Sequence, residues 1–299
     1  MLQLKTAGFK ALEDLRSSGD FASGFLNMDD LNRKADKAIA RFLDERFAVS
    51  QELGGVFLLL ELLDRAIRTS DQELMDKPNL PESERLEMVQ ALDRQNVMMQ
   101  LYPRYIDTLL PFITEVAERT KREVRVLELA SGAGGLAFAL AETAKQRNLD
   151  VRITASDIVP AFIEEGNVMA AQKELPVSFR LLNAFAMNEL EKGEFDIVVM
   201  AQSLHHFTPG QLAIIIAQSA RHATTAFVGI DGYRSLLLAG GVPLIASLQG
   251  IGSFTLDGLT SARKFYSELE LDIISEIATG RRGHTVDCSW PFTVFKIRF

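Results

Sequence analysis

The sequence has little cysteine and no dense basic segment. Its single cysteine, Cys288, excludes an internal disulfide and any metal site built from several cysteines. Basic residues gather only in pairs such as Lys121-Arg122, and 40 acidic residues against 32 basic ones give a net charge of −8. Because a phosphate backbone is bound by a concentrated Lys/Arg face, this argues against nucleic acid as the partner. Lys5 and Lys10 interrupt any apolar leader, so we expect a cytoplasmic protein.

Tyrosine and tryptophan are also scarce, with four Tyr and one Trp against 19 Phe. Phe carries no polar group, so this excess suits a dry core or an apolar ligand cavity. The uncharged segment 235–256 is long enough to suggest a membrane span. Gly240, Gly241 and Pro243 break it, however, which favours a buried helix and loop and no integral span. A lid that touches an apolar substrate or a membrane surface is the alternative.

The two parts of the chain have different hydrophobic patterns. Apolar residues at helical spacing predict helices over 29–69 and 82–101, and Pro103 opens another helix that runs to Thr120. From residue 123 onward, short β-rich runs alternate with helical ones. The predicted strands are 124–129, 151–156, 177–182, 195–201, 224–230, 284–290 and 291–299, and the predicted helices are 135–146, 160–172, 186–192, 209–221 and 263–278.

This alternation predicts an α/β fold: a doubly wound, mostly parallel sheet of seven strands that follows an α-helical N-terminal domain. The last two strands meet at Trp290-Pro291 without room for a crossover helix, so they should form a terminal antiparallel pair. We expect residues 1–120 to form a helical domain that covers the substrate as a lid or builds a dimer. Residues 121–299 are expected to form a Rossmann-like domain.

A glycine-rich turn, 130–135, follows the first predicted strand and opens a helix. Such a turn lets a ligand approach the backbone and the free N–H groups of the helix. One interpretation is an NAD(P)-dependent oxidoreductase, because Gly132, Gly134 and Ala137 fit G-x-G-x-x-[GA] and Asp157 lies 20 residues beyond Ala137. Glu128 argues otherwise, since a carboxylate buried ahead of the glycines needs a cationic partner. The amino group and sulfonium of S-adenosylmethionine would supply one.

The segment VLELASGAGGLA resembles the first motif of the class I S-adenosylmethionine-dependent methyltransferases, of the small-molecule type. Asp157 resembles the acid of this family that binds the ribose hydroxyls, and FDIVVMAQSLHHF (195–207) resembles its fourth motif. The terminal antiparallel pair is a further trait of the family. The resemblance implies S-adenosyl-L-methionine as the cofactor and S-adenosyl-L-homocysteine as the product. The cofactor-binding residues that it implies are Glu128, Ala130, Gly132, Gly134, Asp157, Ile158, Asn183, Ala184, Phe185, Ala201 and Gln202.

Specific roles follow from the resemblance. Glu128 should face the methionine amino group, and Gly132 and Gly134 should give the backbone access to the methionine and ribose. Ile158 and Phe185 are candidates to sandwich the adenine, with core packing as the alternative. The sequence departs from the family pattern twice. Ala130 replaces the first glycine, which is tolerable if its φ is negative, and Asn183 replaces the more usual Asp against the adenine edge.

The candidate catalytic bases are His205 and His206, which follow the fourth sheet strand, because imidazole titrates near neutrality. The candidate acceptor-binding residues are Tyr102, Arg104, Asp231, Tyr233 and Arg234, and no metal site is expected.

We therefore predict methyl transfer to oxygen or carbon of a small, apolar or aromatic acceptor that is polyketide-, quinol- or lipid-like. An NAD(P)-dependent oxidoreductase and a non-catalytic binding protein with this fold are the alternatives, and a homodimer is left open.

Overall fold

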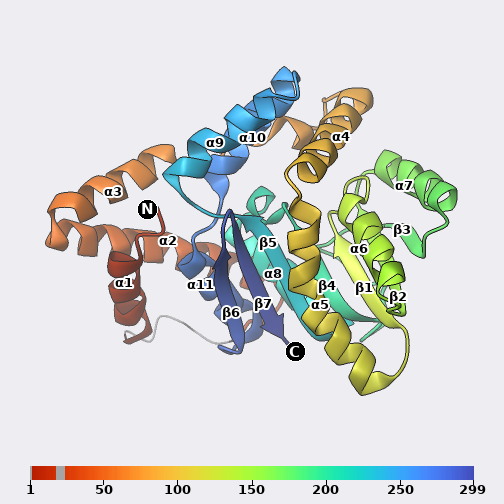
Figure 1. Ribbon diagram of the computed structural model, residues 1–299. Coiled ribbons are helices and arrows are strands. Elements are labelled where there is room, and N and C mark those ends of the chain that lie inside the picture. Colours follow the sequence, from red (N-terminus) through yellow and green to blue (C-terminus); the bar gives the residue numbers. More distant parts are fainter. Residues whose placement is uncertain (1, 18–23) are drawn as a thin grey trace.

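A seven-stranded sheet forms the centre of the computed structural model, which describes residues 2–17 and 24–299 (Figure 1). The strand order is β3-β2-β1-β4-β5-β7-β6. The first five strands are parallel, whereas β7 pairs antiparallel with both β5 and β6. The strands are β1 (Val124–Leu129), β2 (Val151–Asp157), β3 (Val177–Leu181), β4 (Phe195–Ala201), β5 (Ala223–Gly232), β6 (His284–Ser289) and β7 (Phe292–Arg298). The predicted fold class and the terminal antiparallel pair are confirmed.

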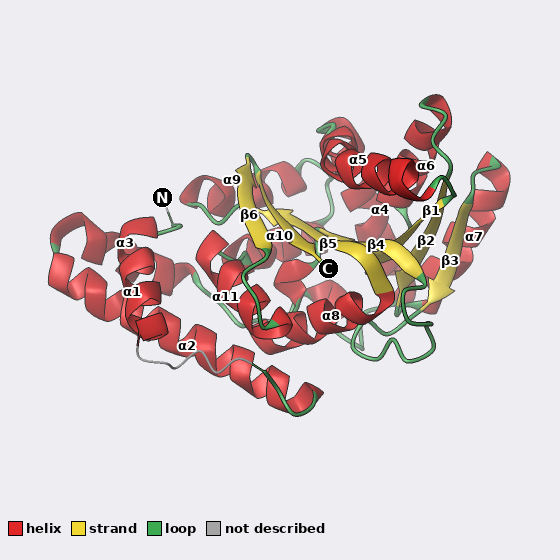
Figure 2. Ribbon diagram, turned by 90° about the horizontal axis from the view of Figure 1, so that it is seen from below, coloured by secondary structure: helices red, strands yellow, loops and turns green. Residues whose placement is uncertain are grey.

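Helices cover both faces of the sheet, which is why its central strands are mostly apolar (Figure 2). On one face lie α5 (Leu101–Thr120), α6 (Gly135–Gln146) and α7 (Pro160–Lys173). On the other face lie α8 (Pro209–His222) and α11 (Glu268–Thr279). This arrangement leaves the carboxyl ends of the parallel strands free for a ligand.

The N-terminal helices pack against this sandwich. They are α1 (Lys5–Ser17), which the sequence did not predict, α2 (Met28–Leu53), α3 (Gly55–Ile67), the short 3-10 helix η1 (Leu74–Asp76) and α4 (Glu82–Met98). Leu12 of α1 and Phe42 of α2 share one core with Leu212 of α8 and Ile273 of α11. The helical region is therefore packed on the sheet domain through a common apolar core.

Two predicted helices are wrong. Residues 186–192 form turns, in which Asn183 C=O accepts the Ala186 N–H and the Glu194 carboxylate accepts the Glu191 N–H. The helix predicted over 263–278 is divided between α10 (Gly252–Lys264) and α11. Ser267 separates them because it caps α11 in a capping box with Glu270.

The uncharged segment is exposed, so the prediction of a buried helix is wrong. It forms α9 (Leu236–Ser247) and the start of α10, and Ala246 is the buried residue of α9. Leu237, Leu244 and Leu248 are 69%, 68% and 71% exposed. The reason is that α9 packs on α10, with Ala246 against Gly258, while its remaining faces point outward. Within residues 2–17 and 24–299, no helix has the length and apolarity to cross a membrane.

Candidate cofactor and acceptor site

A cavity of about 860 Å³ lies at the carboxyl ends of β1, β2 and β4. Its floor includes the turn after β1, Ile158 after β2, and Ala201 to Ser203 after β4. Residues of the segment between α3 and α5, among them Met75 of η1 and Val89 and Leu92 of α4, cover it from the other side. The volume lies in the usual range of small-molecule sites, about 300–1,000 Å³.

Glu128 lies in the cavity wall as a buried acid without a counter-ion. It is 4% exposed, and its Oε2 has no hydrogen-bond partner among the residues described. Burial, with a smaller contribution from the charge of Asp157, raises the pKa of Glu128 to about 8, although the Ala137 backbone N–H opposes this. A ligand cation placed beside Glu128 would pair with the free oxygen.

Asp157 ends β2 and fixes the turn after β1. Its Oδ2 accepts the Gly132 N–H at 2.9 Å, and its Oδ1 accepts the Val159 N–H at 3.0 Å. Burial raises the pKa of Asp157, while these N–H groups oppose the rise. The N-cap of α7 is Val159, so Asp157 does not cap that helix. Ile158 lines the cavity and is 63% exposed, which excludes the core-packing alternative for this residue.

The backbone of the glycine-rich turn differs from the expectation at two positions. Ala130 has φ +51°, so the expectation of a negative φ is wrong. Gly132 lines the cavity as predicted and has φ +54°. Gly134 does not give a ligand access to the backbone: a Cβ there would lie 2.3 Å from the Phe179 ring, so this glycine is needed for packing. Gly135, which was not predicted, lines the cavity and faces the Tyr102 hydroxyl.

Because Ala130 holds a left-handed conformation that costs an L-residue about 1–2 kcal/mol, we expect Ala130→Gly to stabilise the chain by about 0.5–1 kcal/mol. Urea unfolding monitored by circular dichroism would measure it. Ala133 is the matched control, since it lies in the same turn without a positive φ, and Ala133→Gly should lower the free energy of unfolding. A lower free energy of unfolding in Ala130→Gly would contradict the claim that Ala130 is strained.

The other cofactor candidates divide into two groups. Ala201, Gln202 and Phe185 line the cavity, and Gln202 accepts a hydrogen bond from Asn96 Nδ2 at 2.6 Å. Asn183 and Ala184 lie outside the lining. The exposed Asn183 side chain turns back on its own loop and accepts the Phe185 N–H, so the structure does not place it at the cavity.

His205 forms a buried pair with Asp231. Its Nδ1 lies 2.8 Å from Asp231 Oδ2, and its backbone N–H donates to the same oxygen at 2.8 Å. Burial alone would raise the pKa of Asp231, but the contact with His205 holds it below its ordinary value. His205 Nε2 is buried and finds no hydrogen-bond partner in the described part of the chain. With Nδ1 carrying the proton toward Asp231, Nε2 offers a free lone pair.

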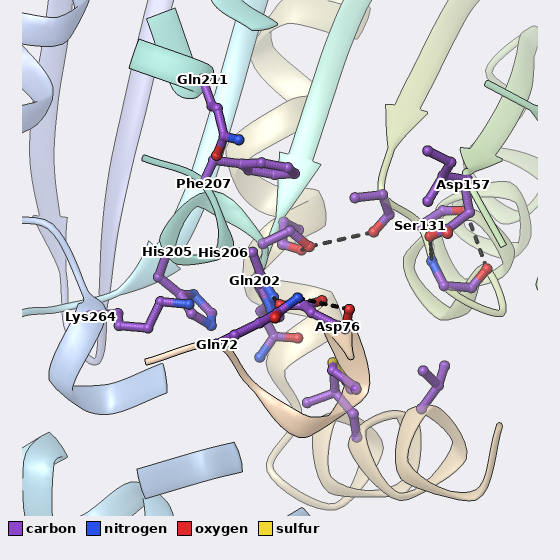
Figure 3. A pocket seen from close by; sticks show the side chains of 18 of the residues that line it. Gln72, Asp76, Ser131, Asp157, Gln202, His205, His206, Phe207, Gln211 and Lys264 are labelled. Carbon is purple, nitrogen blue, oxygen red and sulfur yellow. Dashed lines mark hydrogen bonds and ion pairs between the residues drawn. The ribbon is translucent and has the colours of Figure 1, made fainter. Parts of the chain in front are cut away.

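His206 lies against a second carboxylate, Asp76 of η1, at 2.7 Å from its Nδ1. Burial would lower the pKa of His206, but Asp76 and Glu73 outweigh it and raise the pKa to about 9. His206 is therefore protonated at neutral pH, and of the two predicted bases His205 is the one whose Nε2 has no hydrogen-bond partner in the described part of the chain. Figure 3 shows both histidines on one side of the pocket, and Asp157 and Ser131 on the other.

Of the predicted acceptor-binding residues, only Tyr102 lines the cavity, where its hydroxyl donates to Asp93 at 2.6 Å. Arg104 is exposed and donates to the Trp290 carbonyl, and Tyr233 packs edge-on against the Trp290 ring. Asp231 also lies outside the lining, and it contacts His205, which lines the cavity.

Arg234 is also wrongly predicted as an acceptor-binding group. It is 1% exposed, and its Nε donates to Asp64 of α3 at 2.7 Å. This buried ion pair ties the end of β5 to the N-terminal helices, so its role is structural.

The sequence did not indicate the residues that η1, α4 and α10 bring to the cavity: Asp76, Asp93, Asn96 and Lys264 line it, and Glu73 lies behind it at the histidines. They are polar residues in unremarkable helical segments, and no motif marks them.

Residues 126–225, which hold this glycine turn, Asp157 and the histidines, match the family described as a methyltransferase domain. This segment is a methyltransferase domain of the S-adenosylmethionine-dependent class I. The chain is 26% identical over 165 residues to the non-reducing polyketide synthase dbaI of Emericella nidulans, a match that covers 55% of this chain and 6% of the synthase. The chain thus spans a small part of that relative.

Two solved structures resemble this chain in fold. The plantazolicin methyltransferase BamL, in complex with a triazolic desmethylPZN analog and SAH, aligns with a TM-score of 0.50 and 16% identity over 69% of this chain and 77% of BamL. The DszA carbon methyltransferase aligns with a TM-score of 0.49 and 19% identity over 67% of this chain and 53% of the other.

The residues present fit S-adenosylmethionine, the cofactor of this family. Glu128 offers an unpaired buried oxygen to a cationic amino group, and Gly132 brings the backbone of the turn to the cavity without a side chain. Asp157 faces the same cavity between Gly132 and Ile158.

Proposed function

We propose that this methyltransferase transfers the methyl group of S-adenosylmethionine to an oxygen or an acidic carbon of a small, apolar or aromatic acceptor. One observation carries the proposal: a single cavity is lined by two acids suited to the cofactor, Glu128 and Asp157, and by a buried histidine with a free lone pair, His205.

The acceptor class is inferred from the covering elements. Met75, Val89, Leu92, Phe185 and Phe207 line the cavity and give it an apolar wall. The relative from Emericella nidulans is named a polyketide synthase, and a polyketide chain offers both acidic carbons and phenolic hydroxyls. These observations support a polyketide-like acceptor over a charged metabolite.

The cofactor supplies a methyl group on a positively charged sulfur. His205 Nε2 takes the proton of the acceptor's O–H or C–H group, and Asp231 stabilises the imidazolium that forms. When bound, the cofactor would supply its methyl group to this oxygen or carbon nucleophile and would leave as S-adenosylhomocysteine. The remaining contribution of the chain is positioning and exclusion of water, because this is an in-line displacement.

An acceptor panel tests this proposal. We expect phenols, quinols and 1,3-dicarbonyl compounds to gain one methyl group from S-adenosylmethionine, detected by mass spectrometry of the products. A panel in which these compounds are unchanged while a charged small metabolite is methylated would contradict it.

Binding of S-adenosylhomocysteine at pH 7 should release close to one proton per chain. A carboxyl with a pKa of about 8 is mostly protonated at pH 7, and an amino cation beside Glu128 favours its ionised form. The affinity should therefore rise between pH 6 and pH 8. Calorimetric titrations in two buffers of different ionisation enthalpy measure the release. Glu128→Gln, which has no proton to lose, is the control, and equal proton release by this variant would contradict the assignment.

A further inference from the structure

The side of the cavity opposite Asp157 contains a cluster that the proposed function uses only in part. Glu73, His205 and His206 each present one ligand atom, and these three atoms lie within 4.8 Å of one another. His205 Nε2 lies 3.5 Å from Glu73 Oε1, and His206 Nε2 lies 3.6 Å from Glu73 Oε2. We propose that Glu73, His205 and His206 form a binding site for a divalent transition-metal ion.

The distances match the size of such an ion. Tetrahedral zinc with bonds of about 2.1 Å holds its ligand atoms about 3.4 Å apart. The two distances to Glu73 differ from this by a few tenths of an ångström. Two imidazoles and one carboxylate suit zinc, iron or cobalt better than magnesium or calcium, which prefer oxygen ligands.

Both imidazoles are oriented as metal-bound histidines are. Asp231 contacts Nδ1 of His205 at 2.8 Å, and Asp76 contacts Nδ1 of His206 at 2.7 Å. A carboxylate on the far nitrogen fixes the ring and leaves Nε2 directed at the ion, which would displace the proton that His206 carries there at neutral pH. His205 is 5% exposed, and its Nε2 has no hydrogen-bond partner within the described ranges. A buried, unpartnered nitrogen directed at a carboxylate is the independent sign of a missing ligand.

The charges around the cluster favour a cation. Glu73 is 2% exposed, and Asp76 and Asp231 add two further carboxylates. Lys264 Nζ, at 3.2 Å from Glu73 Oε1, is the cation that competes with the metal, and Ser261 also donates to Glu73 at 2.8 Å. Three carboxylates outnumber one ammonium, so negative charge remains for a divalent ion.

This inference goes beyond the proposed function and does not depend on it, because the ion needs neither cofactor nor acceptor to bind. Three protein ligands leave a coordination position open for water or an oxygen of the acceptor. The ion uses the same lone pair of His205 that otherwise takes the acceptor's proton. In the metal-loaded chain, the acceptor's oxygen would bind the ion and its proton would pass to solvent.

Titration of chelator-treated protein with Co²⁺ tests the site by calorimetry and by the absorption of bound cobalt. We expect one ion per chain, and a loss of affinity on the order of 100-fold or more in Glu73→Gln and in His206→Ala. His284→Ala is the matched control, since His284 also pairs with a carboxylate, Asp272, but lies outside the cluster, and it should bind like wild type.

Lys264→Met distinguishes a lost ion site from a misfolded chain. Removal of the competing ammonium should tighten Co²⁺ binding several-fold, and misfolding would not do so. The proposal is overturned if wild type shows no saturable binding, or if Glu73→Gln and His206→Ala bind Co²⁺ as tightly as His284→Ala does. S-adenosylhomocysteine binding, measured in the same samples, separates the two proposals. A chain that binds Co²⁺ but not S-adenosylhomocysteine would contradict only the proposed function. A chain that binds S-adenosylhomocysteine but not Co²⁺ would contradict only the ion site.

Discussion

His205→Ala is expected to lower the turnover number on the order of 1,000-fold while S-adenosylhomocysteine binds with its wild-type affinity. General-base groups contribute about 100- to 10,000-fold, and His205 is the imidazole of the cavity with a buried free lone pair. We expect turnover to fall without a loss of S-adenosylhomocysteine binding because His205 lies across the pocket from Asp157 (Figure 3). Single-turnover kinetics with a methylated acceptor from the panel would measure the change.

The positioning residue Asp231 gives the companion variant. Asp231→Asn keeps the size of the side chain but removes the charge that holds the proton on Nδ1 and stabilises the imidazolium. We expect a smaller loss than in His205→Ala and a changed pH profile of the turnover number. A His205→Ala chain with undiminished turnover would exclude His205, whether it acts as a base or through a metal ion.

Asp157→Ala is expected to weaken S-adenosylhomocysteine binding by about 100-fold or more. The carboxylate anchors the Gly132 and Val159 N–H groups, and hydrogen bonds to charged groups are worth about 1.5–3 kcal/mol each. The bonds to Gly132 and Val159 hold the turn in place, while the bonds from the two ribose hydroxyls would be made only with the ligand bound. Loss of two such ligand bonds corresponds to at least a hundredfold at about 1.4 kcal/mol per tenfold. Calorimetric titration of the folded variant measures it.

Two variants control for this result. Asp157→Asn keeps one oxygen acceptor and should bind more tightly than Asp157→Ala, while Asp287→Ala, on the exposed edge strand β6, should bind like wild type. Thermal unfolding of each variant shows whether the fold is kept. Unchanged affinity in Asp157→Ala would remove Asp157 from the cofactor site.

The sheet could be predicted from the sequence because its strands are short β-rich runs separated by helical ones. The turn after β1, Asp157 and the histidines could be found because they follow strand ends in sequence. The exposure of α9 could not be predicted, since apolarity alone does not tell whether another element covers a helix. The burial of Arg234 could not be predicted either, because its partner Asp64 lies 170 residues away and no pattern indicates that pairing.

The acceptor side of the site was the least predictable. Glu73 and Asp76 come from a short 3-10 segment and its flank, and they reach the histidines only because the chain between α3 and α4 returns over the sheet. The positive φ of Ala130 could not be predicted either, because the turn keeps a backbone conformation that favours glycine although the residue there is alanine.

The central claim is that the cavity binds S-adenosylmethionine between Glu128 and Asp157. Calorimetric titration of the purified chain with S-adenosylhomocysteine at pH 8, repeated with excess NAD⁺ present, tests it most directly. The account predicts saturable binding of one molecule per chain, unaffected by NAD⁺ and weakened in Asp157→Ala. The absence of binding heat, together with a fluorescence change when NADH is added, would contradict it.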